Sequence, residues 1–150
     1  ITAVHSHCYT GGLELALAGD IIVASANAKF GDTHGKWALT PVWGMSQRLP
    51  RRVGAAKAKE MMFTSRTYSG AQAEAMGLAN FCVADDAFEA EVEKLTKEIL
   101  GNSWFSHRGN KRLVDDTEGL PLKAGLAHEI YRTEGRGPDS QERIAAFMKK

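Results

Sequence analysis

Cysteine is scarce in this sequence of 150 residues, which contains only Cys8 and Cys82. The two residues lie in different apolar surroundings, and their spacing is not that of a metal-binding pair. His5 and His7 precede Cys8, but no carboxylate follows at ligand spacing. We therefore expect free thiols in a reducing compartment, which predicts a cytoplasmic protein with no metal ion.

The sequence also lacks an excess of charge of one sign and any long apolar run. It has 19 basic and 18 acidic residues and a net charge of +1, which predicts no binding to nucleic acid or to an anionic membrane surface. No apolar run approaches the roughly 20 residues of a membrane span. Hydrophobic residues make up 43% and charged residues 25%, as in a globular domain with a core of its own.

The first residues lack an initiating Met, a cap or a turn signal. The segment 1–4 is apolar and partly β-branched, which is typical of the middle of a strand. Because a strand needs a neighbour with which to pair, we expect a further segment upstream of Ile1 in the whole protein.

Hydrophobic spacing predicts an α/β first part and a helical second part, divided near Asp85. Ser69 and Gln72 predict an N-cap and a short helix that ends at Gly77. Strands are predicted at 1–4, 21–24, 29–31 and 80–84, and loops at 5–10 and 32–40. The other predicted helices are 12–19, 41–49 (with Pro41 in its first turn), 55–64, 87–100, 104–114, 122–133 and 141–148.

Two glycines and a carboxylate open the helix predicted at 12–19, in the run Gly11-Gly12-Leu13-Glu14. The first turn of a helix presents unpaired backbone N–H groups and a partial positive charge, and glycine lets a substrate oxygen approach closely. The segment thus combines a hydrogen-bond donor for an oxyanion with an acid/base group. The simpler alternative is that Glu14 is an exposed glutamate that only favours the helix dipole.

Several motifs resemble the enoyl-CoA hydratase/isomerase (crotonase) family, in its order and at its spacing. They are Gly11 to Ser25, Ala28 to Gly31, Thr40 to Gly54 and Ala73 to Asn80. The resemblance implies an α/β fold, with a spiral of ββα turns followed by helices that form trimers. Residues 1–85 would be the last part of the spiral and carry the active-site helix. Residues 86–150 would form the oligomerisation region of a homotrimer or dimer of trimers.

The resemblance also implies an acyl-CoA thioester as substrate, with coenzyme A as part of it and no other cofactor. The Gly11 N–H corresponds to one of two family donors to the thioester oxygen, and the other donor would lie before Ile1. Glu14 corresponds to the first of two catalytic glutamates. Twenty residues after Glu14, His34 stands in the place of the second glutamate.

This pattern predicts an enoyl-CoA hydratase in which His34 takes part in acid/base chemistry, since imidazole exchanges protons near neutral pH. An isomerase, another reaction of CoA thioesters, and an acyl-CoA-binding subunit without activity remain as alternatives. His34 is otherwise interpreted as a surface residue or a hydrogen-bonded supporting residue, and Asp32 as a side chain that turns the loop.

By the same resemblance, Phe147 and Lys150 of the terminal helix would lie near the nucleotide end of CoA. The alternative is an amphipathic helix with a solvated basic end.

Overall fold

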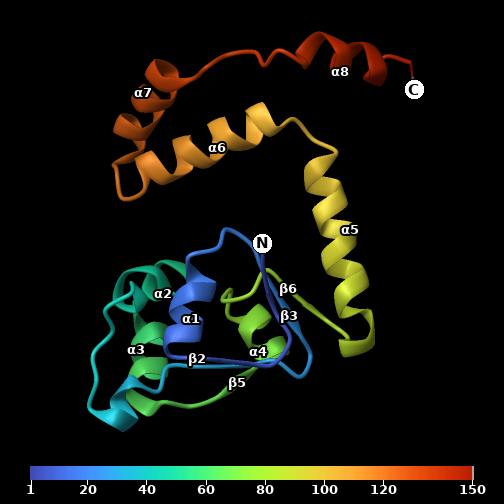
Figure 1. Ribbon diagram of the computed structural model, residues 1–150. Helices are drawn as coiled ribbons and strands as arrows, with labels where there is room; N and C mark the ends of the chain where they lie inside the picture. The colour runs from blue at the N-terminus through green and yellow to red at the C-terminus, as the bar shows by residue number, and fades with distance from the viewer. Residues whose placement is uncertain (150) are drawn as a thin grey trace. The chain divides into compact units, whose positions relative to one another are not determined.

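The computed structural model describes residues 1–149, which form two compact units (Figure 1). The first unit comprises Ile1–Thr96, and the second begins at Lys97. Lys150 lies outside the described residues. The functional division predicted at Asp85 stays a prediction.

Two small sheets organise the first unit. One is entirely parallel, with the order β1-β3-β6, and β3 is buried at every position, as its continuous apolar run predicts. In the other sheet β2 pairs in parallel with β4, and β4 pairs antiparallel with β5. The strands are β1 (Thr2–Val4), β2 (His7–Tyr9), β3 (Ile22–Ser25), β4 (Lys29–Gly31), β5 (Tyr68–Ser69) and β6 (Phe81–Val83).

Helices α1 to α4 lie between these strands in the sequence and α5 follows the last strand; α1, α2 and α3 pack in sequence against one another (Figure 1). The predicted cap at Ser69 is confirmed, because its hydroxyl accepts the Gln72 N–H while the Gln72 side chain accepts the Ser69 N–H. The helices are α1 (Gly11–Leu17), α2 (Met45–Val53), α3 (Ala55–Thr64), α4 (Gly70–Ala75) and α5 (Phe88–Leu100), with 3-10 turns η1 (His34–Trp37) and η2 (Asp85–Ala87).

Three local predictions were wrong. The segment 5–10 contains strand β2, and the segment 32–40 contains the turn η1. The helix expected from Pro41 begins only at Met45, because Gly44 has a φ of 110° that no right-handed helix can include. It also continues through Pro50 to Val53, although proline lacks the N–H that the interior of a helix uses.

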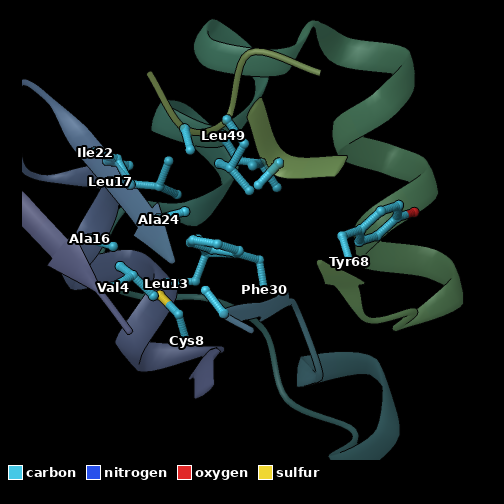
Figure 2. Packing of buried hydrophobic residues seen from close by; sticks show 14 of the residues in the cluster. Val4, Cys8, Leu13, Ala16, Leu17, Ile22, Ala24, Phe30, Leu49 and Tyr68 are labelled. Atoms are coloured by element: carbon cyan, nitrogen blue, oxygen red, sulfur yellow. The ribbon is translucent and has the colours of Figure 1, made fainter. Parts of the chain in front are cut away.

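One apolar cluster joins α1, both sheets, and helices α2 and α3 (Figure 2). Phe30 of β4 is fully buried within it, together with Leu13 of α1 and Leu49 of α2. Each such side chain contributes about 1.5–3 kcal/mol to stability when fully buried. This cluster fixes α1 against the sheets and therefore fixes the side chains that α1 carries.

The second unit consists of helices, as predicted. Arg108 and Arg112 of α6 both form ion pairs with Glu134, which follows α7. Large apolar side chains are exposed on these helices, among them Trp104, Leu122 and Tyr131. The helices are α6 (Trp104–Thr117), α7 (Leu122–Arg132) and α8 (Ser140–Phe147). No helix in the described part of the chain has both the length and the apolar character of a membrane span.

Candidate active site

Glu14 is buried rather than exposed, with only 3% of its surface accessible to solvent. Its Oε1 accepts two backbone N–H groups, from Trp43 at 2.9 Å and from Met45 at 3.1 Å. These two bonds satisfy the need of a buried carboxylate for hydrogen-bond partners. The interpretation of Glu14 as a solvated surface glutamate was therefore wrong.

The sequence of α1 accounts for the position of Glu14. Leu13, Ala16 and Leu17 are buried in the core, so the helix turns the face that carries Glu14 towards the protein interior. Glu14 thus projects from a helix that the core holds in place. The two backbone donors to its Oε1 come from the segment between η1 and α2 and from the first residue of α2.

The Trp43 ring approaches Gly11 closely. A Cβ atom added at Gly11 would lie 2.9 Å from Cζ3 of Trp43, which is closer than van der Waals contact allows. Gly11 is also the first residue of α1, where N–H groups have no partner within the helix. The residue predicted as an oxyanion donor therefore lies under an indole ring that is itself 60% exposed.

His34 lies just after β4, at the start of η1, and is 7% exposed. Its Nδ1 is 2.6 Å from Oδ1 of Asp32, and its backbone N–H donates to the same oxygen at 3.1 Å. Asp32 is 1% exposed. Asp32 thus shapes the turn, as predicted, and also binds the imidazole, which the sequence reasoning missed. An Asp two residues before a His looks like any turn-forming Asp, so this spacing carries no separate signal for the ring contact.

The structure brings Glu14 and His34 together, as the sequence predicts. Nε2 of His34 lies 4.0 Å from Oε2 of Glu14. This separation is too long for a direct hydrogen bond. A single oxygen that forms hydrogen bonds of about 2.8 Å to two groups spans roughly 4.4 Å, which is close to this separation.

Thr10 and Thr33 join the two segments that carry Glu14 and His34. Their hydroxyl groups are hydrogen-bonded, and the Thr33 N–H donates to Oγ1 of Thr10 at 3.2 Å. Thr10 has a φ of 50°, which is uncommon for a residue with a side chain, and its N–H donates to the Gly31 carbonyl at 3.0 Å. Neither threonine was predicted as part of the site, although each adjoins a residue that was.

The remaining predicted site residues are not brought to this place. Phe147 ends α8 in the second unit and is 76% exposed, and Lys150 lies outside the described residues. Their role near a nucleotide stays a prediction. Within residues 1–149 no group of three His, Cys, Asp or Glu side chains is placed to hold a metal ion.

Comparison with known proteins identifies the family. The family model described as enoyl-CoA hydratase/isomerase matches residues 1–149. The chain belongs to the enoyl-CoA hydratase/isomerase family. The match includes both Glu14 and His34.

Similar proteins within the enoyl-CoA hydratase/isomerase family bear hydratase names. The chain is 39% identical to the short-chain-enoyl-CoA hydratase of Clostridioides difficile, over 91% of this chain and 90% of that protein. It is 38% identical to the mitochondrial enoyl-CoA hydratase domain-containing protein 2 of Bos taurus, over 100% of this chain but 53% of that protein.

Solved structures show the same fold. An enoyl-CoA hydratase from Bacillus anthracis aligns with a TM-score of 0.90 and 32% identity, over 95% of this chain and 56% of that one. Apart from the Clostridioides difficile protein, the chain spans about half the length of these relatives. The crotonase fold predicted from the motifs is therefore confirmed for the part of that fold that this chain covers.

Proposed function

We propose that this chain supplies the acid/base groups of an enoyl-CoA hydratase, which adds water to the double bond of a 2-enoyl-CoA thioester. The observation that carries the proposal is the gap of 4.0 Å between Glu14 Oε2 and His34 Nε2. Both residues are buried, and the separation is close to the span of one oxygen atom with its two hydrogen bonds. Membership of the hydratase/isomerase family supports the same reaction.

The anchored carboxylate explains how Glu14 would act. Because Oε1 already accepts the Trp43 and Met45 N–H groups, Oε2 is the oxygen that faces His34. A water molecule bound between Oε2 and Nε2 is held by two groups that exchange protons. Fixing the attacking oxygen in this way replaces a random encounter by an oriented one, which lowers the barrier.

In the proposed reaction the water oxygen forms a bond to Cβ, and the electron pair of the double bond moves toward the thioester carbonyl. Glu14 Oε2 accepts the proton that the water loses, and His34, which starts this step as an imidazolium paired with Asp32, delivers the proton on its Nε2 to Cα. The proton on Glu14 then returns to His34, so that only water is consumed. The Gly11 N–H would stabilise the charge on the thioester oxygen, and a donor of this kind contributes about 3 kcal/mol to catalysis.

The test uses the full-length product of the gene and a short 2-enoyl-CoA, whose loss is followed by its ultraviolet absorbance. Turnover that falls about 100-fold or more in both Glu14→Gln and His34→Gln would support the proposal, as expected for a positioned acid/base group. Glu89→Gln is the matched control, because Glu89 lies in the first turn of α5 and is exposed.

Other outcomes identify the alternatives. Conversion of a 3-enoyl-CoA to the 2-enoyl isomer without hydration would indicate an isomerase. Binding of acyl-CoA without turnover of either substrate would indicate a subunit without activity. Hydration that is unchanged in Glu14→Gln would remove Glu14 from the mechanism and refute the proposal.

We further propose a homotrimer or dimer of trimers with no cofactor beyond the CoA of the substrate, in a reducing compartment such as the cytoplasm. The exposed apolar side chains of α6 and α7, including Trp104, Ile130 and Tyr131, support assembly through the second unit. The free thiols Cys8 and Cys82 are compatible with a reducing compartment. Sedimentation equilibrium of the full-length product decides the assembly, and a monomer at micromolar concentration would refute it.

A further inference from the structure

Asp32 is a buried carboxylate to which the proposed mechanism assigns no step. A carboxylate with 1% exposure is costly unless hydrogen bonds compensate for the lost water. Its Oδ1 lies 2.6 Å from Nδ1 of His34 and accepts the backbone N–H of the same residue at 3.1 Å. Two bonds from one residue to one buried oxygen hold that residue firmly in a single orientation.

This contact determines which nitrogen of His34 carries a hydrogen. Because an ionised carboxylate only accepts hydrogen bonds, Nδ1 must be the donor to Asp32. In neutral imidazole the other nitrogen, Nε2, then has the free lone pair. Nε2 is the atom that faces Glu14 Oε2 at 4.0 Å.

We infer that Asp32 is a positioning residue of this site, which fixes the tautomer and the ring orientation of His34 so that Nε2 can exchange protons opposite Glu14. The inference rests on the proposed hydratase function. Asp32 itself touches neither the gap nor Glu14 in the described contacts, so it acts only through His34.

Charge explains why Asp32 and His34 would act as one unit. With a neutral imidazole the pair carries one negative charge, and with a protonated imidazole it carries none. A single carboxyl group has the same two charge states. The pair can therefore do the work of one carboxyl group opposite Glu14, with Nε2 as the atom that takes or gives the proton.

A glutamate at the position of His34 would have no tautomer to fix. It would also place a second carboxylate beside the buried Asp32, and like charges at short distance oppose ionisation. Replacing Asp32 by asparagine should thus be harmful when His34 is present and harmless or helpful in the His34→Glu background. This reversal separates positioning from a purely structural role.

The experiment compares kcat for hydration in four full-length proteins: wild type, Asp32→Asn, His34→Glu and the double variant. We expect Asp32→Asn to lower kcat about 100-fold in the wild-type background, because the amide lacks the charge that favours the protonated form of His34 in acid/base catalysis. We expect no loss in the His34→Glu background. Asp86→Asn, at an exposed position, is the matched control and should leave kcat unchanged. Equal losses in both backgrounds would show that Asp32 only shapes the turn and would overturn the inference.

A second readout does not depend on activity. Nitrogen-15 spectra of the imidazole groups report which ring nitrogen carries hydrogen, and comparison with His34→Gln assigns the His34 signal. We expect Nδ1 of neutral His34 to be protonated in the wild type. A wild-type spectrum with hydrogen on Nε2 alone would overturn the inference, even if Asp32→Asn did not fold. Absence of hydration by the wild type would refute the proposed function, while the spectrum would still decide the role of Asp32.

Discussion

Replacement of Glu14 by alanine or by glutamine should separate its structural from its chemical role. Oε1 accepts the N–H groups of Trp43 and Met45, and Met45 is fully buried. Each hydrogen bond to a charged acceptor contributes about 1.5–3 kcal/mol. Glu14→Ala removes both acceptor contacts and leaves the Met45 N–H without a partner, so we expect a loss of about 3–5 kcal/mol in the free energy of unfolding.

Glu14→Gln should behave differently, because the amide oxygen can still accept both N–H groups. Only the charge is lost, so we expect a decrease of about 1 kcal/mol in the free energy of unfolding. The amide NH₂ group then faces His34 and cannot accept a proton from water. The glutamine variant should therefore be folded and inactive, whereas the alanine variant should be both destabilised and inactive.

Urea denaturation at a fixed protein concentration measures both free energies, provided that the slope m is the same in all variants. Glu89→Ala is the matched control, since it removes an exposed glutamate from the first turn of a helix, and it should cost less than about 1 kcal/mol. If Glu14→Ala were as stable as Glu14→Gln, the two backbone hydrogen bonds would not be what holds the carboxylate, and the prediction would be refuted.

Two further predictions concern Gly11 and the thiols. Gly11→Ala should lower kcat and lower the free energy of unfolding by about 1–3 kcal/mol, because the new Cβ would lie 2.9 Å from the Trp43 ring. In urea denaturation, adding Trp43→Ala to this variant should restore its stability. Trp43→Ala alone should not raise the stability of the wild type. Burial raises the pKa of the Cys8 thiol to about 11, and the pKa of Cys82 is also raised by burial. In mildly alkaline solution mass spectrometry should show alkylation of the folded protein at the more accessible Cys82, and modification of Cys8 at the same rate would contradict its burial.

Local sequence signals were sufficient where one segment determines its own structure. The β-branched run that forms β3 and the cap at Ser69 are examples, since burial on both faces and the cap each leave a local pattern. Strand β2 was missed because His7 and Tyr9 are polar or partly exposed, and pairing with β4 rather than propensity makes the segment a strand. The late start of α2 depends on the backbone of Gly44, whereas the prediction relied on Pro41, three residues earlier.

In the site, too, some residues could be predicted from the sequence and others depend on contacts made only in the folded protein. Family motifs pointed to Glu14 and His34, and the structure places them 4.0 Å apart. The role of Asp32 could not be predicted, because its contact with the imidazole depends on burial after β4 and not on spacing. Nothing in the sequence separates a buried turn-forming aspartate from an exposed one.

Glu14 and His34 are each held in place through one of their two polar side-chain atoms. The carboxylate of Glu14 has two oxygens and the imidazole of His34 has two nitrogens. In each side chain, another part of the protein forms a hydrogen bond with one of these two atoms. Backbone N–H groups hold Oε1 of Glu14, and the Asp32 carboxylate holds Nδ1 of His34. The remaining atoms, Oε2 and Nε2, face each other across the gap. Loss of a holding group should therefore change the orientation of a reactive atom that is still present, whereas loss of Oε2 or Nε2 removes the proton-exchanging atom itself.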